Sequence, residues 1–318
     1  MWTWHVILQY VIELQQKLLG DKIRNKAFYE ALQKVIHKGQ TIVADIGSGT
    51  GFLSFLASQL GAKECFLYEY SDVIEISREL AKTNNIQNCH FVQKHSVEEK
   101  SPPKVDVIVS ETLGNYALEE NIIESVENAK RFLKPGGVII PQKIEQFIAP
   151  VTSPRIYDEM NVWDSVGYDL DLTAAKDSAL NNMYVYKIEP KELMDGILSA
   201  KPWDKIDFKK TEASVRKGHA SWKIGTAGTI YGFAVWWNST LIGNVNISTS
   251  PDAPQTHWDQ IFLPLTSPLQ VQKGDELAVT LRSDSRFEVG IRLQWEVKLN
   301  RAGKEIQGVK MDTQKGAY

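Results

Sequence analysis

The sequence VADIGSGTG, residues 43–51, decides the fold. The apolar residues that open it predict a buried parallel strand, and residues 52–60 have a helical pattern. Glycines at such a junction let the backbone turn sharply and approach a ligand without an intervening Cβ. Phe52 stands where a dinucleotide fingerprint would place its third glycine, which disfavours NAD. Asp45, just before the glycines, suits a ligand that carries an ammonium group rather than a pyrophosphate.

Strands and helices alternate around this turn. The apolar runs that predict buried strands are residues 41–46, 65–70, 105–110 and 138–140. The helical patterns between them are residues 52–60, 73–84 and 122–133. This alternation predicts an α/β fold with a Rossmann-like, doubly wound parallel sheet over residues 41–150. N-terminal helices are expected over residues 1–40, with a break at Gly20.

The C-terminal half has a different pattern. Apolar residues occupy every odd position of residues 289–299, which is the period of a half-buried antiparallel strand. Residues 231–238 (YGFAVWWN) give a second strand signal. We therefore expect an antiparallel β domain, a barrel or a sandwich, over residues 151–318.

Composition narrows the function classes. A hydrophobic fraction of 43% and a charged fraction of 24% are typical of soluble globular proteins. A net charge of −3 does not suit a surface that neutralises nucleic acid, so direct nucleic-acid binding is not expected. Cys65 and Cys89 lack the spacing of a zinc site, so no metal is expected. Polar residues interrupt the N-terminal apolar stretch, which predicts neither a membrane span nor a signal peptide and favours a cytoplasmic protein.

Further acidic and polar residues complete a predicted nucleoside pocket. Glu69 ends the second strand, where a carboxylate can accept the hydroxyl protons of a ribose. Ser96, Val97 and Glu98 follow the apparent third strand, where an adenine ring would lie. The alternative is a generic tight turn with unrelated surface acids.

A pair of glutamates follows the strand at residues 105–110. Glu111 stands at its carboxyl end, the edge of a parallel sheet where ligands bind. Gly114 predicts a turn that folds Glu120 back beside it. Two facing carboxylates match the donor fork of a guanidinium group. The alternative is that Glu119 and Glu120 only begin a helix, where acids favour the N-terminal dipole.

Taken together, these motifs resemble the protein arginine methyltransferases over nearly the whole chain, from about Leu18 to Trp295. The family's cofactor motif is similar to residues 43–54, and its two-glutamate loop has the same separation as Glu111 and Glu120. Its threonine-histidine-tryptophan loop is similar to residues 256–260 (THWDQ), inside the β region.

The resemblance implies S-adenosylmethionine as cofactor and arginine in a protein or peptide as methyl acceptor. The residues that would bind the cofactor are Arg24, Asp45, Gly47, Gly49, Gly51, Glu69, Val97 and Glu98. Glu111 and Glu120 would clamp the substrate guanidinium. His257, placed with them in the catalytic machinery, would pair with Asp21, and Trp258 would wall the substrate entrance.

The resemblance also implies an assembly. The β domain would be a barrel, and a helical dimerisation arm would lie near residues 155–198, with the closest likeness around residues 157–172. A head-to-tail homodimer around a central opening follows from such an arm.

Some positions differ from the family pattern. They are Thr112 and Leu113 in the glutamate loop, and His5, Gln9, Gln15 and Leu18 near the N-terminus. These differences leave open the natural substrate and whether the product is monomethyl, symmetric dimethyl or asymmetric dimethyl arginine.

Two other functions remain open on the sequence. The same fold could act on a small guanidino compound, which the mass of the product would reveal. It could also belong to a cofactor-binding interaction protein without turnover, although such a protein would have no chemical need for both Glu111 and Glu120.

Overall fold

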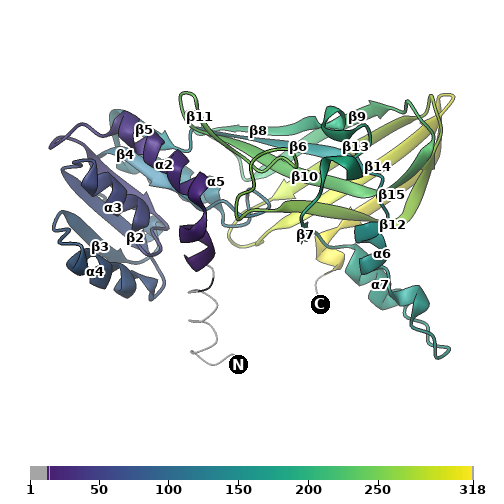
Figure 1. The fold of residues 1–318 in the computed structure, drawn as a ribbon, viewed down its shortest axis with the longest axis horizontal. Helices are drawn as coiled ribbons and strands as arrows, with labels where there is room; N and C mark the ends of the chain where they lie inside the picture. Colours follow the sequence, from purple (N-terminus) through teal and green to yellow (C-terminus); the bar gives the residue numbers. More distant parts are fainter. Residues whose placement is uncertain (1–12, 14, 317–318) are drawn as a thin grey trace.

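The parallel sheet expected from the glycine turn is present in the computed structural model, which describes residue 13 and residues 15–316. Its strands lie in the order β3-β2-β1-β4-β5, and every neighbouring pair is parallel (Figure 1). The strands are β1 (Ile42–Ile46), β2 (Glu64–Glu69), β3 (Cys89–Gln93), β4 (Val105–Ser110) and β5 (Leu133–Ile140). The associated helices are α2 (Lys22–Val35), α3 (Phe52–Gln59), α4 (Val73–Thr83) and α5 (Ile122–Ala129). The predicted α/β class is confirmed.

The strand order fixes where a ligand can bind. The chain builds β1, β2 and β3 outward on one side of the sheet, then returns to place β4 beside β1 on the other side. The loops that leave β1 and β4 therefore diverge at the carboxyl ends of these strands. Such a divergence leaves a crevice, which is the usual ligand site of an open parallel sheet.

The second half of the chain forms a barrel-like antiparallel β domain (Figure 1). One sheet has the order β7-β12-β10-β6-β8, with β11 paired to β10, and the other has the order β15-β14-β13-β9. The first sheet contains β6 (Lys143–Val151), β7 (Tyr184–Tyr186), β8 (Lys201–Asp207), β10 (Gly228–Ile242), β11 (Val245–Ser248) and β12 (Gln260–Val271). The second contains β9 (Val215–Lys223), β13 (Glu276–Asp284), β14 (Arg292–Arg301) and β15 (Lys304–Asp312).

Several predicted boundaries differ from those of the structure, and two of them have a clear local cause. The strand predicted over residues 289–299 begins only at Arg292, because Gly290 has a φ of 71° and the Val289 amide donates to the Arg286 carbonyl in a turn. The helix predicted to reach Leu133 ends at Ala129. Leu133 instead begins β5, where it pairs with Val105 of β4.

A helical arm projects from the β domain (Figure 1). It contains α6 (Arg155–Met160), the short 3-10 helix η3 (Trp163–Ser165) and α7 (Thr173–Leu180). Its tip, residues 166–171, is exposed. Across the described part of the chain, we find no helical segment with both the length and the apolar character of a membrane span.

The two sheets of the β domain approach each other at β8 and β9, and a glycine permits this close contact. A Cβ on Gly218 of β9 would overlap the backbone carbonyl of Trp203 in β8. Backbone cannot move away as a flexible side chain can, so the close approach requires glycine at this position.

We therefore expect Gly218→Ala to lower the free energy of unfolding by at least about 2 kcal/mol, since overpacking a close backbone contact forces the strands apart. Chemical denaturation followed by circular dichroism measures this loss. Gly225→Ala is the matched control, because no heavy atom lies within 4 Å of its added Cβ. Equal stability of the two variants would contradict the proposed contact.

Candidate active site

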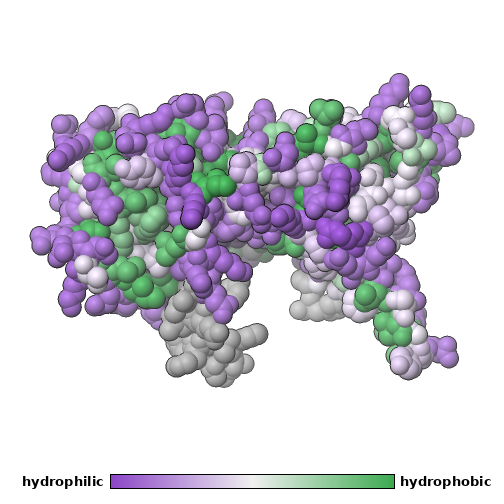
Figure 2. Space-filling model, viewed as in Figure 1, coloured by the Kyte–Doolittle hydropathy of each residue, from purple (hydrophilic) through white to green (hydrophobic). Residues whose placement is uncertain are grey.

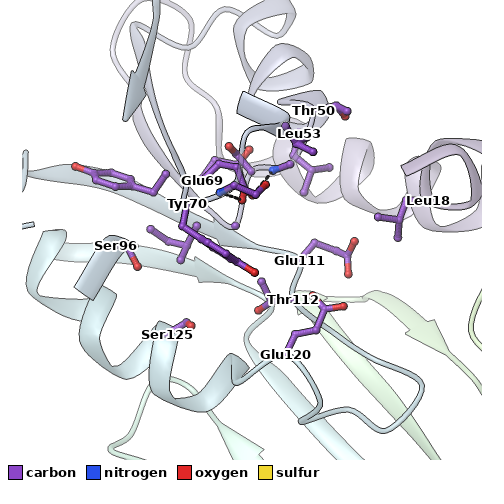
Figure 3. Close-up of a pocket in the computed structure, with 18 of the residues that line it drawn as sticks. Leu18, Thr50, Leu53, Glu69, Tyr70, Ser96, Glu111, Thr112, Glu120 and Ser125 are labelled. Atoms are coloured by element: carbon purple, nitrogen blue, oxygen red, sulfur yellow. Dashed lines mark hydrogen bonds between the residues drawn. The ribbon is translucent and has the colours of Figure 1, made fainter. Parts of the chain in front are cut away.

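A cavity of about 560 Å³ lies at the carboxyl ends of the parallel strands, where the strand order predicts a ligand (Figure 3). The glycine turn after β1, Glu69 at the end of β2 and the loop after β4 all line it. Ser48 and Ser96 also line it, and their buried hydroxyls have no hydrogen-bond partner in the described part of the chain. The cavity thus offers unused polar groups, as a site for a polar ligand should.

The glycine turn is shaped as the sequence predicts. Gly47, Gly49 and Gly51 have φ values of 71°, 52° and 81°, a region that side chains disfavour. A Cβ on Gly47 would lie 2.7 Å from Cγ2 of Thr112 in the glutamate loop. Gly47 and Gly49 line the cavity, whereas Gly51 is the N-cap residue of α3.

The two cofactor acids take different positions in the turn. Glu69 accepts hydrogen bonds from the Gly49 amide at 3.0 Å and the Ser71 amide at 2.8 Å, which fix its carboxylate at the cavity wall. Asp45 is 1% exposed and accepts a hydrogen bond from the Ser54 hydroxyl at 2.8 Å. Burial raises the pKa of Asp45 to about 7. A cationic group bound nearby would favour its charged form.

The loop expected to hold an adenine ring forms the 3-10 helix η1 (Ser96–Glu98). Ser96 and the preceding His95 line the cavity. Val97 and Glu98 are in the same turn but are not among the cavity-lining residues. The adenine-binding roles of Val97 and Glu98 therefore remain predictions.

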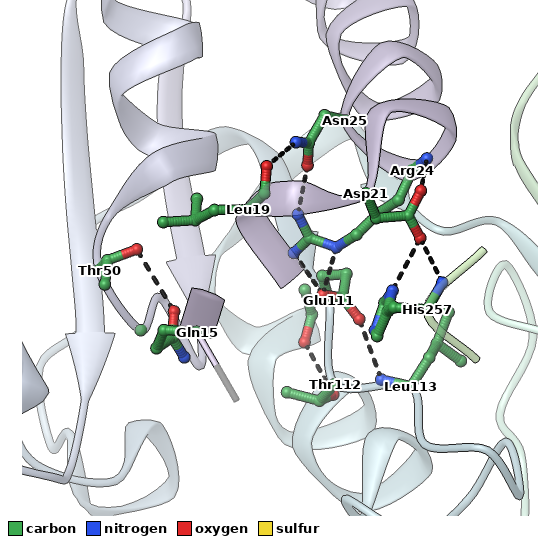
Figure 4. Close-up of polar contacts among 12 residues, drawn as sticks. Gln15, Leu19, Asp21, Arg24, Asn25, Thr50, Glu111, Thr112, Leu113 and His257 are labelled. Atoms are coloured by element: carbon green, nitrogen blue, oxygen red, sulfur yellow. Dashed lines mark hydrogen bonds and ion pairs between the residues drawn. The ribbon is translucent and has the colours of Figure 1, made fainter. Parts of the chain in front are cut away.

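Arg24 connects the N-terminal helix to the glutamate loop (Figure 4). Its Nε donates to Oε2 of Glu111 at 2.8 Å, and its Nη2 contacts the same oxygen. Both side chains are almost fully buried. The resemblance implies that Arg24 holds the cofactor's carboxylate; here its guanidinium lines the cavity and neutralises Glu111.

The two glutamates expected to form a clamp project into the same cavity from opposite ends of one loop (Figure 3). Among the residues that the structure describes, no cationic side chain forms an ion pair with Glu120 as Arg24 does with Glu111. The cavity walls withdraw it from bulk water, and the negative charges of Glu111 and Glu119 lie nearby. These effects raise the pKa of Glu120 to about 7.

Asp21 links helix α2 to the β domain. Its carboxylate caps α2 by accepting from the Arg24 amide at 2.9 Å, and it also accepts from the amide and Nδ1 of His257, both at 2.8 Å (Figure 4). Burial opposes ionisation of Asp21, but these hydrogen bonds hold its pKa below the usual range. The predicted pairing of Asp21 with His257 is therefore present. His257 itself is not among the cavity-lining residues.

Two tryptophans of the β domain hold the glutamate loop. Nε1 of Trp258 donates to the Leu113 carbonyl at 2.7 Å, and Nε1 of Trp237 donates to the Gly114 carbonyl at 3.0 Å. Trp258 is 4% exposed, so it lies behind the loop, and its expected place at the substrate entrance stays a prediction. The role of Trp237 was not predictable from the sequence, because a tryptophan on an apolar strand is most simply interpreted as a core residue.

Most of the unusual positions can be located. Thr112 lines the cavity, and its hydroxyl lies 3.2 Å from that of Ser110. Gln15 accepts a hydrogen bond from Thr50 at 3.3 Å, and Leu18 also lines the cavity. His5 and Gln9 lie outside the described residues. Within the described residues, no cluster of three or more His, Cys, Asp or Glu side chains could hold a metal ion.

This arrangement defines a class of protein. A Rossmann-like sheet with a glycine turn, a carboxylate on the second strand and a cavity between β1 and β4 is typical of S-adenosylmethionine-dependent methyltransferases. Comparison with known proteins agrees, since a methyltransferase-domain family matches residues 37–193. The arginine methyltransferase oligomerization subdomain matches residues 142–300.

Individual relatives lead to the same family. Protein arginine N-methyltransferase 6 of Xenopus tropicalis is 31% identical over 84% of this chain and 82% of its own length. Histone-arginine methyltransferase CARMER of Drosophila persimilis is 30% identical over 89% of this chain, but over only 56% of its own length. The chain belongs to the protein arginine methyltransferase family, and its cofactor is S-adenosylmethionine.

Solved structures support the fold. The Trypanosoma brucei PRMT1 enzyme-prozyme heterotetrameric complex with AdoHcy aligns with a TM-score of 0.81 and 22% identity, covering 94% of this chain and 98% of that one. Arabidopsis thaliana protein arginine methyltransferase 10 aligns with a TM-score of 0.80 and 21% identity, covering 94% and 97%. The predicted family and the expected two-part architecture are confirmed.

Proposed function

We propose that this enzyme methylates a guanidinium nitrogen of arginine in a protein or peptide, with Glu111 and Glu120 as the clamp. The observation that carries the proposal is the convergence of both carboxylates on the cavity that the glycine turn and Glu69 also line. A planar cation between two carboxylates relieves their repulsion and pairs with each through its donor fork.

The residues of the cavity fit the cofactor. Glu69 can accept from ribose hydroxyls, Asp45 suits the amino group, and Gly47 and Gly49 let the backbone approach the ligand. Arg24, Gly51, Val97 and Glu98 complete the proposed cofactor-binding set. S-adenosylmethionine, when bound, supplies a sulfonium-activated methyl group.

The clamp explains how a poor nucleophile can react. A free guanidinium has a pKa of about 12.5–13.8, so its nitrogens are almost always protonated and unreactive. Glu111 and Glu120 would orient one nitrogen and concentrate positive charge on the others, so catalysis rests on positioning and electrostatics. Because the pKa of Glu120 lies near 7, its carboxylate can also accept the proton that the methylated nitrogen loses.

His257 and Trp258 take positioning roles in this proposal. His257 bonds to Asp21, which also bonds to the amide of Arg24, and Arg24 in turn contacts Glu111. Trp258 holds the Leu113 carbonyl, two residues beyond Glu111. Both side chains would therefore fix the clamp from behind, and the substrate-wall role of Trp258 remains part of the proposal.

The central test is transfer of a labelled methyl group from S-adenosylmethionine to an arginine- and glycine-rich peptide. We expect the wild type to label arginine, and Glu111→Gln or Glu120→Gln to lose at least about 100-fold in turnover, because a positioned charge in the transition state is lost. Mass analysis after acid hydrolysis identifies methylarginine.

The Glu120→Gln variant should bind S-adenosylhomocysteine nearly as the wild type does, which provides the folding control. Full activity of either variant would contradict the clamp. Labelling of a free guanidino compound but of no peptide would point to a small-molecule acceptor. Cofactor binding without any methyl transfer would favour an interaction protein.

The pH dependence of kcat/KM tests the state of Glu120. Below pH 7 this carboxyl is mostly protonated and cannot pair with a guanidinium, so kcat/KM should rise about tenfold per unit from pH 5 to 6.5 and level off above 7.5. Glu119→Gln removes a neighbouring negative charge that raises the pKa, and should move the midpoint to lower pH. A flat profile between pH 5 and 8 would exclude this assignment.

We further propose that the chain forms a head-to-tail homodimer through its arm. Val162, Val166, Tyr168 and Leu170 are 47%, 42%, 90% and 63% exposed. Figure 2 shows hydrophobic residues on this projection. Apolar side chains gathered on a projecting segment favour contact with another surface.

We expect the wild type to sediment at twice the chain mass and the double variant Tyr168→Glu, Leu170→Glu to sediment as a monomer, because two buried charges at an interface are unfavourable. Sedimentation velocity distinguishes the two states. Ile306→Glu is the matched control, since Ile306 is 47% exposed on β15, away from the arm. A dimeric arm variant would overturn this interface.

We also propose a cytoplasmic location. The support is that Cys65 and Cys89 are both free thiols, as is usual in a reducing compartment. Microscopy of the tagged chain in its own cells tests the location, and a nuclear or secreted signal would contradict it.

A further inference from the structure

A loop of the β domain, residues 285–291, reaches the cofactor-binding half of the chain. It joins β13 to β14 and is anchored at Ser285, which is fully buried. The side-chain amide of Asn121 donates to the Ser285 carbonyl at 2.5 Å, and the Ser285 hydroxyl donates to Oε1 of Glu124 at 2.7 Å. Asn121 directly follows Glu120, so the loop is fixed to the end of the glutamate loop.

Two residues beyond this anchor, Phe287 joins a row of aromatic rings. Its ring meets that of His95 edge to face, with centroids 5.3 Å apart and an interplanar angle of 89°. His95 stacks in turn on Tyr70, with centroids 6.2 Å apart and an angle of 27°. The three rings come from three segments: the end of β2, the loop before η1 and the β domain.

All three rings line the cavity, and two of them remain unusually open. Tyr70 is 74% exposed and Phe287 is 47% exposed. Figure 3 shows the Tyr70 ring extending from beside Glu69 into the cavity, between Ser96 and Thr112 in this view. Large aromatic surfaces that line a cavity and stay exposed leave apolar area for a ligand to cover.

The position of the rings indicates which part of the ligand would cover them. Glu69 and Gly49 line the cavity and are hydrogen-bonded to each other, and a ribose would be held there. Arg24, on helix α2, lines the same cavity and contacts Glu111. The aromatic row, on Tyr70 and His95, continues from Glu69 toward η1. A flat heteroaromatic base attached to the ribose would therefore meet the rings.

We propose that Phe287 is a cofactor-binding residue that packs against the adenine ring, so that the β domain itself forms part of the nucleoside pocket. The inference rests on the cofactor-binding residues assigned under the proposed function. A phenyl ring offers no hydrogen bonds, so Phe287 favours an aromatic base by contact area and ring geometry.

The anchor of the loop gives this contact a second effect. Ser285 is bonded to Asn121 and Glu124, which follow Glu120 in the chain. Adenine packed against Phe287 would hold the 285–291 loop, and with it the end of the glutamate loop. Cofactor binding thereby helps to place the residue that receives the substrate guanidinium.

The test is the affinity of Phe287→Ala for two ligands, measured by isothermal titration calorimetry. S-adenosylhomocysteine contains adenine, ribose and the amino-acid end. 5′-Methylthioadenosine keeps adenine and ribose but lacks the amino-acid end. We expect Kd to rise about tenfold for both, as base–aromatic stacking would require. Phe287→Tyr keeps the ring and should bind as the wild type does.

Val289→Ala is the matched control, because Val289 is on the same loop and 39% exposed but does not line the cavity. Phe287→Leu keeps an apolar side chain without the ring, and it should also bind both ligands several-fold more weakly if Phe287→Ala does not fold. Unchanged affinity of Phe287→Ala and Phe287→Leu for both ligands would overturn the adenine contact alone. A loss of affinity confined to S-adenosylhomocysteine would also overturn it. A wild type that binds neither ligand would overturn the assigned cofactor site as well.

Discussion

The active site depends on two indole N–H groups that satisfy buried carbonyls of the glutamate loop. The loop leaves β4 through Leu113 and Gly114, whose carbonyls accept from Trp258 and Trp237, and it turns at residues 117–120. A buried carbonyl without a partner is unfavourable, and no neighbour within the loop supplies these bonds. The β domain therefore determines the path between Glu111 and Glu120. The relative placement of Glu111 and Glu120 thus depends on both halves of the chain.

The electrostatics of the cavity follow from its excess of acids. Asp45, Glu69, Glu111, Glu119 and Glu120 all line it, and Arg24 is bonded to Glu111. Burial and mutual repulsion raise the pKa values of Asp45 and Glu120 to about 7. Such a cavity favours cationic ligands, because each bound positive charge offsets repulsion that the protein already carries. An ammonium or sulfonium group in the cofactor and a guanidinium in the substrate both meet this requirement.

The sequence predicted features whose cause is local. The positive φ angles of Gly47, Gly49 and Gly51 follow from glycine itself, and the place of Glu69 follows from the end of a strand. The expected return of Glu120 to the cavity is observed, but the turn that produces it lies at residues 117–120 and not at Gly114. The resemblance to the family supplied the pairing of His257 with Asp21, which lie far apart in the chain.

Features that depend on tertiary contacts were not predictable in the same way. The apolar alternation of the sequence runs over residues 289–299, but the strand itself begins only at Arg292. The alternation does not show that the chain turns at Gly290. Phe287 and Ser285 fell in a segment without any motif, so nothing in the sequence connected them with the cavity. The hydrogen bond of Trp237 could not be predicted from the sequence, because its partner Gly114 is 123 positions away in the chain.

The bonds from Trp237 and Trp258 to the glutamate loop also constrain recombination between relatives. In a chimera of this chain's parallel-sheet half and another member's β domain, the loop carbonyls would come from one parent and the tryptophan donors from the other. The loop carbonyls of one parent would then have to fit the indoles of the other. Crossovers that move residues 111–121 together with residues 237 and 256–260 would keep both sets of bonds. The unit that must be exchanged intact between relatives is thus a set of separate segments from both domains, rather than either domain alone.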